Sequence, residues 1–359
     1  FFNPPRYLHL LELIPTKDTD PEVLRTVSEF GDKVLGKGIV VAHDVPGFAA
    51  NRVGVGCMSR AMKVMVEMGL TPDVVDALTG PLVGRPKRAT CRTADLSGLD
   101  IVTTVADNIE KATGEPVKFP EVMDKMVEKG LLGEKTGAGF YKKDKSGGKT
   151  TILTINFETF EYEDRGKVRL EELNELRLLP TPEERVKALL DSDGKAGEFT
   201  RRTLFHQIHY AASKVGEVAA TAEDVDNALK WGFGWEVGPL ELAESLGRER
   251  CLKAFEENGL DVPEYFKTER AASTGTGLLT VKSLNKKVVG NSDATLWDAG
   301  DGVALLQFHS KGNSIGAKTL EMFDKAHEKV TKWTTAHVCL EILCFLSLKS
   351  LAVTRNRFV

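Results

Sequence analysis

The feature that most constrains this chain is an internal repeat of one helical unit. The stretch Asn51–Gly80 is similar to the stretch Arg201–Gly232. The aligned positions are Arg52 with Arg202, Asp76 with Asp226, and "ADLSG" at Ala94 with "AESLG" at Ala243. Two copies of one unit predict a duplication whose copies pack pseudo-symmetrically against each other. The second copy has Arg201 where the first has Asn51, so the second copy is expected to be structural.

Helical spacing continues through the first copy. A stripe of methionines, with Ala61 among them, recurs at intervals of three and four residues from Met58 to Met68. Such a stripe is usually adaptable core, and a contribution to an acyl-chain pocket is the secondary interpretation. Thr71 followed by Pro72 predicts the start of the next helix. The sequence therefore predicts a mainly α fold.

The N-terminal residues follow a different pattern. The run from Tyr7 to Pro15 predicts a short strand, with Leu8, Leu10, Glu12 and Ile14 on one face. A carboxylate buried among aliphatic side chains needs a cationic or hydrogen-bonding partner, or a proton. Glu12 is therefore either a partnered buried group or a solvated residue of an edge strand.

A second short strand, Ile39 to Ala42, leads into a turn, and a helix is expected to open near Phe48. This places Asn51 in the first turns of that helix, where backbone N–H groups are unpaired and the dipole is positive. An amide at this position can bind a carbonyl or hydroxyl oxygen. The alternative is that Asn51 only caps or solvates the helix end.

Three stretches together resemble the 3-hydroxyacyl-CoA dehydrogenases. They are "FFNPP" with the strand that follows it, "LGKGIVVAHDVPGFAANRV" from Leu35, and "GEKTGAGFYKK" from Gly133. In that family a His-Phe-x-Asn-Pro motif precedes a strand that carries a glutamate. The catalytic histidine would then be the residue before Phe1, and the 359-residue chain is expected to be an inactive part of a longer enzyme.

The resemblance also implies roles for particular residues. Glu12 would hold the imidazolium of the catalytic histidine, and Asn51 would position the reacting oxygens. Asn3 and Lys135 would contact the cofactor NAD. From the residues alone, a solvated lysine in a glycine-rich surface turn is the preferred interpretation of Lys135.

A dinucleotide-binding fingerprint is missing from the sequence. No Gly-x-Gly-x-x-Gly follows a strand: "GVG" at Gly54 lies in a helical pattern, and "STGTG" at Ser273 lies between polar runs. The larger part of the NAD-binding domain is therefore expected upstream of Phe1.

The first repeat departs from the family at one turn. Where the family usually has Gly-x-Pro-x-Gly-Pro, this chain has "GRPKRATCR", which carries Arg85, Lys87, Arg88 and Arg92. A basic run is usually a solvated face. It could also meet a phosphate or an acidic partner.

The C-terminal part changes character. A Ser/Thr/Gly/Lys-rich linker precedes a stretch that resembles the opening of an enoyl-CoA hydratase (crotonase) domain, with an apolar strand Val303–Phe308 and a helix from Ala317. After Trp333 the resemblance fails, because the expected glycine-rich turn is absent, and the remainder is taken as a divergent tail.

The expected architecture is two tandem helical domains of the 6-phosphogluconate-dehydrogenase type. They follow the last strands of a Rossmann domain and precede the start of a truncated crotonase α/β domain. The expected boundaries are 1–45 for the NAD-binding remnant, 46–143 for the first helical domain, 144–199 for a connection, 200–267 for the second repeat, 268–291 for the linker, 292–332 for the crotonase start and 333–359 for the tail.

Composition narrows the remaining classes. The formal net charge is −4 with mixed signs, which does not favour nucleic acid. Five scattered cysteines fit reduced thiols in a cytoplasmic protein, and no pair has metal-ligand spacing. His206 and His209 are expected on a helix surface, without metal. No stretch is an adequate membrane span.

The predicted function is part of an NAD-dependent L-3-hydroxyacyl-CoA dehydrogenase of fatty-acid β-oxidation, with acyl-CoA as substrate partner. The helical repeats are expected to form either a homodimer or an intramolecular pseudo-dimer. The alternative is a non-catalytic helical module for substrate binding or dimerisation.

Overall fold

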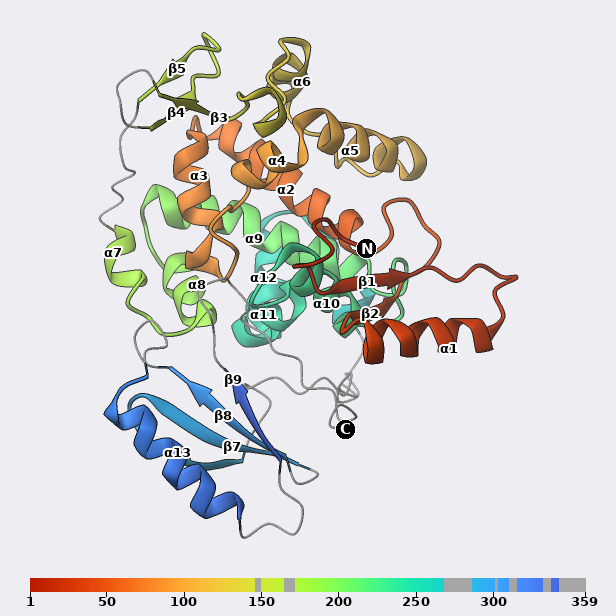
Figure 1. Cartoon of the computed structure of the whole chain (residues 1–359). Helices are drawn as coiled ribbons and strands as arrows, with labels where there is room; N and C mark the ends of the chain where they lie inside the picture. Colours follow the sequence, from red (N-terminus) through yellow and green to blue (C-terminus); the bar gives the residue numbers. More distant parts are fainter. Residues whose placement is uncertain are drawn as a thin grey trace. The chain divides into compact units, whose positions relative to one another are not determined.

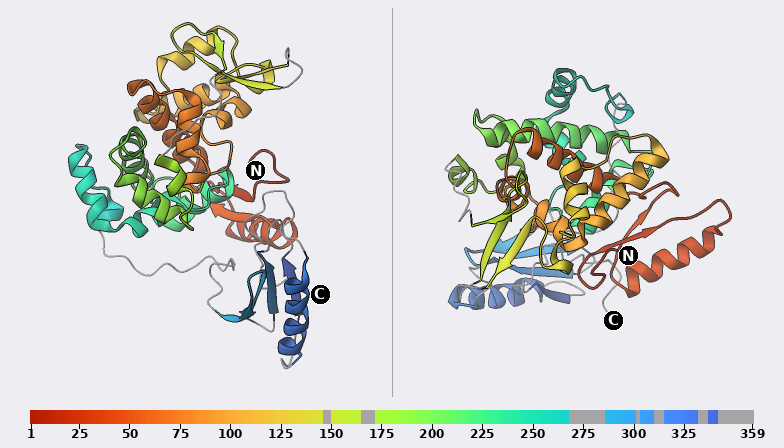
Figure 2. Two further views of the ribbon diagram at one scale, coloured as in Figure 1. Left: turned by 90° about the vertical axis from the view of Figure 1, so that its left-hand side faces the viewer. Right: turned by 90° about the horizontal axis from the view of Figure 1, so that it is seen from above.

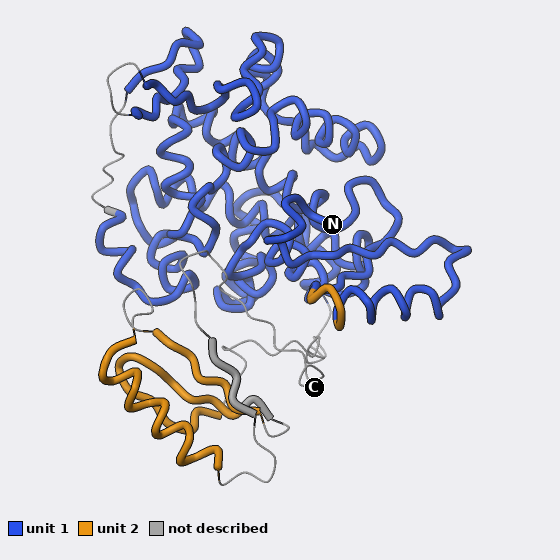
Figure 3. The backbone as a smooth tube through the Cα atoms, viewed as in Figure 1, with its two compact units in different colours: residues 1–32, 37–271 blue, residues 33–36, 272–359 orange. Residues whose placement is uncertain are grey.

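The computed structural model describes residues 1–145, 150–164, 172–267, 286–300, 303–309, 315–331 and 337–341 (Figure 1). The chain divides into two compact units, one of residues 1–32 and 37–271 and one of residues 33–36 and 272–359 (Figure 3). Most described residues of the first unit are helical, as the spacing of apolar residues predicts.

The N-terminal strands form a parallel pair. β1 (Leu10–Leu13) lies beside β2 (Gly38–Val41), with Leu10 opposite Gly38 and Glu12 opposite Val40. They are joined through α1 (Pro21–Glu29) and a π-helical turn, η1 (Phe30–Val34). Asp20 caps α1 by accepting the N–H of Glu22, with Pro21 at the first helical position. Both predicted strands are confirmed, and β1 is shorter than the predicted run.

The helices of the two repeats follow one another in the same order. The first repeat and its extension comprise α2 (Ala50–Glu67), α3 (Pro72–Thr79), η2 (Pro81–Val83), α4 (Cys91–Ser97), α5 (Leu99–Thr113), α6 (Glu121–Glu128) and η3 (Glu134–Thr136). The second comprises α9 (Lys195–Ser213), α10 (Ala222–Phe233), α11 (Pro239–Leu246), α12 (Arg248–Glu257) and η4 (Glu264–Phe266).

An aspartate caps the start of a helix in each repeat. Asp76 on α3 accepts the backbone N–H of Cys91 at 2.6 Å and so caps α4. Asp226 on α10 accepts the N–H of Leu240 at 2.9 Å and so caps α11. Because the aligned residues make equivalent contacts, the sequence repeat is also a structural repeat.

A glycine likewise ends the third helix of each repeat. Gly98 follows α4 with φ of 95°, and Gly247 follows α11 with φ of 92°. Both then open the next helix, α5 or α12. A side chain is strained at such positive φ values, which explains the glycine in "ADLSG" and "AESLG".

The first helices of the two repeats, α2 and α9, run side by side (Figures 1 and 2). Gly56 on α2 faces Tyr210 on α9 so closely that a Cβ on Gly56 would lie 2.3 Å from the tyrosine ring. The two hydrophobic cores of this unit each contain residues from both repeats. The repeats therefore fold as one packed body, as the duplication predicts.

The region predicted as connection carries its own elements. β3 (Tyr141–Asp144), β4 (Thr151–Ile155) and β5 (Tyr162–Glu163) form an antiparallel sheet, followed by α7 (Glu172–Leu176) and α8 (Pro182–Leu190). Pro182 stands at the first position of α8, where its missing N–H costs no hydrogen bond. Thr181 caps α8 by accepting the N–H of Glu184.

The second unit is a four-stranded sheet with one helix. Its elements are β6 (Lys287–Gly290), β7 (Ala294–Gly300), β8 (Val303–Phe308), α13 (Ala317–Val330) and β9 (His337–Glu341). The strand order is β6-β7-β8-β9, with β8 and β9 parallel and the other pairs antiparallel.

The structure corrects two boundaries here. β6 lies inside the predicted linker 268–291, and β9 lies inside the predicted divergent tail. Each strand is stabilised by its neighbour in the sheet, β7 for β6 and β8 for β9, which the local pattern does not reveal. "STGTG" at Ser273 and the tail beyond Glu341 lie outside the described residues.

Candidate functional site

Glu12 is the buried carboxylate of the N-terminal strand. Its side chain is 9% exposed, and its Oε1 accepts the N–H groups of Ala49 at 3.1 Å and Ala50 at 2.8 Å. These amides stand at the N-terminus of α2, so Glu12 satisfies unpaired donors and meets the positive end of the helix dipole. The interpretation of Glu12 as a solvated edge residue is therefore wrong.

Two opposing effects act on the Glu12 carboxyl. Burial raises its pKa, and the hydrogen bonds from Ala50 and Ala49 lower it in part. The net direction is upward. Among the described residues, Oε2 has no hydrogen-bond partner, so one carboxyl oxygen is left for a further donor.

Asn51 lies in the first turn of α2, one residue after the amide that Glu12 accepts. The turn before it needs positive φ at Gly47 (80°) and Phe48 (51°). The N-cap position is Ala49, and the helix has no side-chain cap of its own. Asn51 therefore does not act as the cap, and within the described part of the chain its half-buried amide makes no hydrogen bond.

A buried ionic cluster lies directly after Asn51, and sequence reasoning missed it. The Arg52 side chain is fully buried and pairs with Glu115 and Glu217, both at 2.7 Å. Lys214, 7% exposed, pairs with the same two carboxylates, both at 2.5 Å. The Tyr210 hydroxyl donates to Glu115 at 2.7 Å.

The cluster ties three distant parts of the chain together. Arg52 Nη1 also donates to the carbonyl of Pro46 at 3.0 Å, in the loop that leads to α2. Burial raises the pKa of Glu115, but hydrogen bonds from Arg52, Lys214 and Tyr210 outweigh it, and the net shift is downward. The ionised cluster therefore holds the loop before Asn51 against the second repeat.

The alignment of the repeats does not predict this cluster, because the aligned residues have different surroundings in the two copies. Arg52 aligns with Arg202, which is half-exposed and pairs with Glu67 and Glu198 on the surface. Asn51 aligns with Arg201, which donates to the carbonyls of Leu190 and Ser192. The local signal for the cluster is weak, because Lys214 and Glu217 lie three residues apart just after α9 and nothing in their pattern indicates that they face Arg52.

Asn3 is exposed at the start of the chain, after which the Asn3–Pro4 bond is cis. Its neighbour Phe2 packs against Phe233 of α10, with ring centroids 6.3 Å apart. The N-terminal segment is thus anchored to the second repeat. Asn3 itself has no contact with Glu12 or Asn51 among the described hydrogen bonds.

Lys135 lies apart from this site. In η3 it is 44% exposed and pairs with Asp100 at 2.5 Å, at the first turn of α5. Ile109, near the other end of α5, contacts the Gly47 turn before α2. At 1.5 Å per residue, residues 100 and 109 are about 13 Å apart along the helix axis. Lys135 is therefore not brought to Glu12 and Asn51.

The described ranges contain no group of three or more His, Cys, Asp or Glu side chains placed to hold a metal. They contain no helix long and apolar enough to cross a bilayer. Cys57, Cys91 and Cys251 are buried free thiols.

Two family models match the chain. The model of the 3-hydroxyacyl-CoA dehydrogenase C-terminal domain matches residues 47–143 and again residues 197–288, that is, both repeats. The model of the 3-hydroxyacyl-CoA dehydrogenase NAD-binding domain matches residues 1–45, which include β1 and β2.

Individual relatives agree with the models. A probable 3-hydroxyacyl-CoA dehydrogenase of Bacillus subtilis is 39% identical over 92% of this chain and 46% of the relative. A second, of Deinococcus radiodurans, is 58% identical over 40% of this chain and 42% of the relative. The chain thus spans less than half the length of either protein.

Among solved structures, 3-hydroxybutyryl-CoA dehydrogenase of Escherichia coli superposes with a TM-score of 0.52 at 22% identity, over 74% of this chain and 67% of that one. This likeness concerns the fold. The family models cover both helical repeats and the N-terminal strands. The chain therefore belongs to the 3-hydroxyacyl-CoA dehydrogenase family, with a short part of the NAD-binding domain followed by two C-terminal helical domains.

Proposed function

We propose that the full-length gene product is an NAD-dependent L-3-hydroxyacyl-CoA dehydrogenase of cytoplasmic fatty-acid β-oxidation, and that this chain supplies its Glu12 and Asn51. The observation that carries the proposal is the juxtaposition of a buried carboxylate and a free amide at the N-terminus of α2. Family membership supports the reaction class.

The proposed role of Glu12 is to orient a histidine base. Oε1 is held by two backbone N–H groups, and Oε2 is left to accept an imidazole N–H. When the base takes the hydroxyl proton of the substrate, an imidazolium forms in a poorly solvated site. A fixed carboxylate then supplies the counter-charge of the imidazolium and determines which tautomer the neutral imidazole adopts.

The proposed role of Asn51 is to position the oxygens of the acyl group. Its amide stands in the first helical turn, where unpaired N–H groups and the dipole favour a partial negative charge. A carbonyl that forms at C3 would accept a hydrogen bond there. The cluster around Arg52 keeps this turn in place.

NAD would accept the hydride in this reaction. The described residues do not form a complete NAD site, since the matching part of the NAD-binding domain ends at residue 45 and Lys135 is paired with Asp100. Asn3 and Lys135 as NAD contacts therefore stay predictions for the full-length protein.

Two finer points of architecture belong to the proposal. The packing of α2 on α9 supports an intramolecular pseudo-dimer of the repeats over a homodimer. The second unit contains the hairpin β7–β8, helix α13 and the parallel strand β9. This order of elements supports the proposal that the unit is the opening of a crotonase-like domain.

The test of Glu12 is steady-state kinetics of Glu12→Gln in the full-length gene product, with acetoacetyl-CoA and NADH. We expect kcat to fall by ~10²–10⁴-fold with KM for acyl-CoA little changed, because glutamine keeps an acceptor for the α2 amides and loses the charge. Glu121→Gln, on the exposed face of α6, is the matched control. An unchanged kcat, or a loss confined to KM, contradicts the role of Glu12.

The test of Asn51 is Asn51→Ala in the same assay. Loss of one donor to a developing oxyanion typically lowers kcat by ~10²–10³-fold. Asn108→Ala, at an exposed position of α5, should leave kcat and KM unchanged. If both alanine variants behave alike, Asn51 has no part in the reaction.

A further inference from the structure

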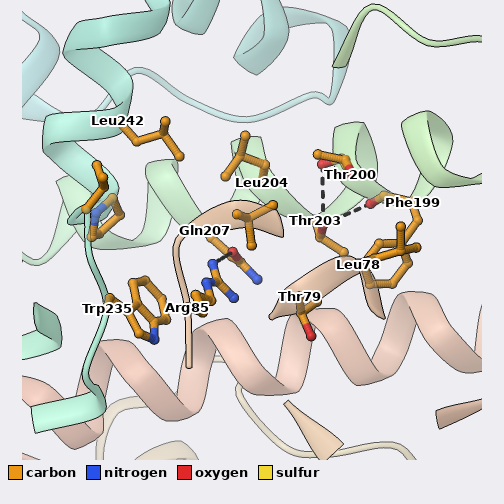
Figure 4. A pocket seen from close by; sticks show the side chains of 13 residues that line it. Leu78, Thr79, Arg85, Phe199, Thr200, Thr203, Leu204, Gln207, Trp235 and Leu242 are labelled. Carbon is orange, nitrogen blue, oxygen red and sulfur yellow. Dashed lines mark hydrogen bonds between the residues drawn. The ribbon is translucent and has the colours of Figure 1, made fainter. Parts of the chain in front are cut away.

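A pocket opens where the loops after α3 and α10 meet the middle of α9 (Figure 4). Its cavity volume, counted as the space that the centre of a water molecule can occupy, is about 30 Å³. A single water needs ~10–15 Å³ by this measure, so the pocket holds two or three waters or one small molecule. Its lining residues come from both repeats and are separate from the Glu12–Asn51 site.

Arg85 is the cation of this pocket. Its Nη2 donates to Oε1 of Gln207 at 2.7 Å, and its guanidinium lies over the ring of Trp235, 3.9 Å from the centroid. In Figure 4 the guanidinium lies between these two side chains. Among the described residues it makes no other hydrogen bond and no ion pair, although a guanidinium has five N–H donors.

Arg85 is only partly exposed, so little water is available to stabilise a cation that has no carboxylate partner among the described residues. Burial lowers the pKa of Arg85 to about 10, so the side chain is still charged at neutral pH. Arg52, which is fully buried between the repeats, has two carboxylate partners. Among the described residues, the partners of Arg85 are a neutral amide and an aromatic face, and no carboxylate balances its charge.

The pocket is held open by its loops. The N–H of Glu236, the residue after Trp235, donates to the carbonyl of Gly84, the residue before Arg85, at 2.7 Å. Gly84 and Gly234 have φ of 73° and 71°, which side chains rarely adopt. The arginine and the tryptophan therefore project from two turns that are fastened to each other.

The rest of the lining is mostly apolar. Leu204 and Leu242 face the pocket together with other aliphatic residues. The threonine hydroxyls of Thr200 and Thr203 donate to carbonyls of their own helix, at 2.8 Å each. No carboxylate lines the described pocket. The chemistry that fits is one negative charge at Arg85 and a short hydrocarbon beside the leucines.

We propose that this pocket binds a short-chain monocarboxylate, whose carboxylate pairs with Arg85 and whose hydrocarbon tail contacts Leu204 and Leu242. A planar carboxylate matches the two-pronged guanidinium. A phosphate group carries between one and two negative charges at pH 7, against one cation in this pocket. The site is independent of the proposed dehydrogenase activity.

The test is calorimetric titration of the full-length gene product with butyrate, at ionic strength matched by chloride. The control ligands are butyramide, which keeps the shape without the charge, and inorganic phosphate, which keeps a charge without the tail. We expect saturable butyrate binding, and neither control ligand should bind with comparable affinity. Because Trp235 lines the pocket, its fluorescence should change on the same titration curve.

Variants then locate the site. Arg85→Met keeps the length of the side chain and should weaken butyrate binding at least ~10-fold, as loss of a charged hydrogen bond does. Arg88→Met, an exposed position of the same basic run, should change it by less than a factor of two. Arg85→Lys, which keeps the charge, should bind better than Arg85→Met.

Three outcomes overturn the proposal, and the first two need no variant. They are the absence of saturable butyrate binding to the wild-type protein, butyramide or phosphate binding as tightly as butyrate, and butyrate binding that survives Arg85→Met.

Discussion

At the scale of single residues, Arg52 shows that the contribution of a side chain to stability depends on its surroundings. Arg52 and Arg202 are aligned by the repeat, yet Arg52 is fully buried between two carboxylates and Arg202 lies half-exposed at the surface. A buried ion pair is not itself a large source of stability, but removal of one partner leaves an uncompensated charge.

The repeat provides a matched pair of variants for this contrast. We expect Arg52→Met to lower the free energy of unfolding by ~3–5 kcal/mol, because among the described residues Lys214 would then be the one cation paired with both Glu115 and Glu217. Arg202→Met should cost at most ~1 kcal/mol. Urea titration followed by circular dichroism measures both, and similar losses in the two variants contradict the buried-cluster interpretation.

At the scale of elements, each repeat uses one buried aspartate to start its third helix. Burial and, second, the nearby Glu241 carboxylate raise the pKa of Asp226 to about 7, against the N–H groups of Leu240 and Glu241, which lower it. Burial likewise raises the pKa of Asp76 to about 6, against the N–H of Cys91 and the hydroxyl of Tyr141. These helix starts therefore titrate far above an ordinary aspartate.

This shift predicts how stability depends on pH. The folded chain takes up a proton at Asp226 near pH 7, whereas the unfolded chain does so near its ordinary pKa of 3.8. Stability from this group is therefore present at low pH and is lost as pH rises through 7. We expect the melting temperature to rise as pH falls from ~8 to ~6.5. Unfolded His206, whose ordinary pKa is 6.5, takes up protons toward the lower end of this range and opposes the trend in part.

The measurement is calorimetry across that pH range, with Asp226→Asn as the test variant and Asp18→Asn, at an exposed loop position, as the control. Asp226→Asn should flatten the dependence by about the contribution of one titrating group, on the order of 1 kcal/mol over this range. A slope that is unchanged in Asp226→Asn assigns the pH dependence elsewhere.

At the scale of the whole first unit, the duplication creates one body. Gly54 and Gly56 let α2 approach the second repeat: a Cβ on Gly54 would lie 2.3 Å from the ring of Phe233, and one on Gly56 would lie 2.3 Å from that of Tyr210. Because both hydrophobic cores draw on both repeats, a disturbance at this contact should reach each of them.

Gly56→Ala tests this arrangement, because the two packing outcomes predict opposite signs for the change in the free energy of unfolding. Alanine normally stabilises a helix relative to glycine by about 1 kcal/mol, whereas overpacking costs ~1–3 kcal/mol. We expect net destabilisation and a single transition for both repeats. Thr104→Ala, at an exposed position of α5, should be neutral or slightly stabilising. Two separate transitions, of which only one moves in Gly56→Ala, contradict a common body.

Much of the architecture was readable in local patterns. Pro21, Pro72 and Pro182 mark the first positions of their helices, and the glycines at 98 and 247 mark where helices end, because these residues act on the backbone at their own positions. The apolar strand Val303–Phe308 was predicted with its observed bounds. The repeat also predicted that its two copies pack together.

The site needed contacts between distant residues. Glu12 meets the amides of Ala49 and Ala50 across 37 and 38 positions, and Arg52 meets Glu217 across 165. Whether a charged side chain is buried, paired or exposed depends on such neighbours, since desolvation and pairing belong to the folded environment and not to the residue type. For this reason the local pattern placed Glu12 on a strand and Asn51 on a helix, whereas only the tertiary structure shows that Glu12 binds the start of the helix that carries Asn51 and that Lys135 lies apart.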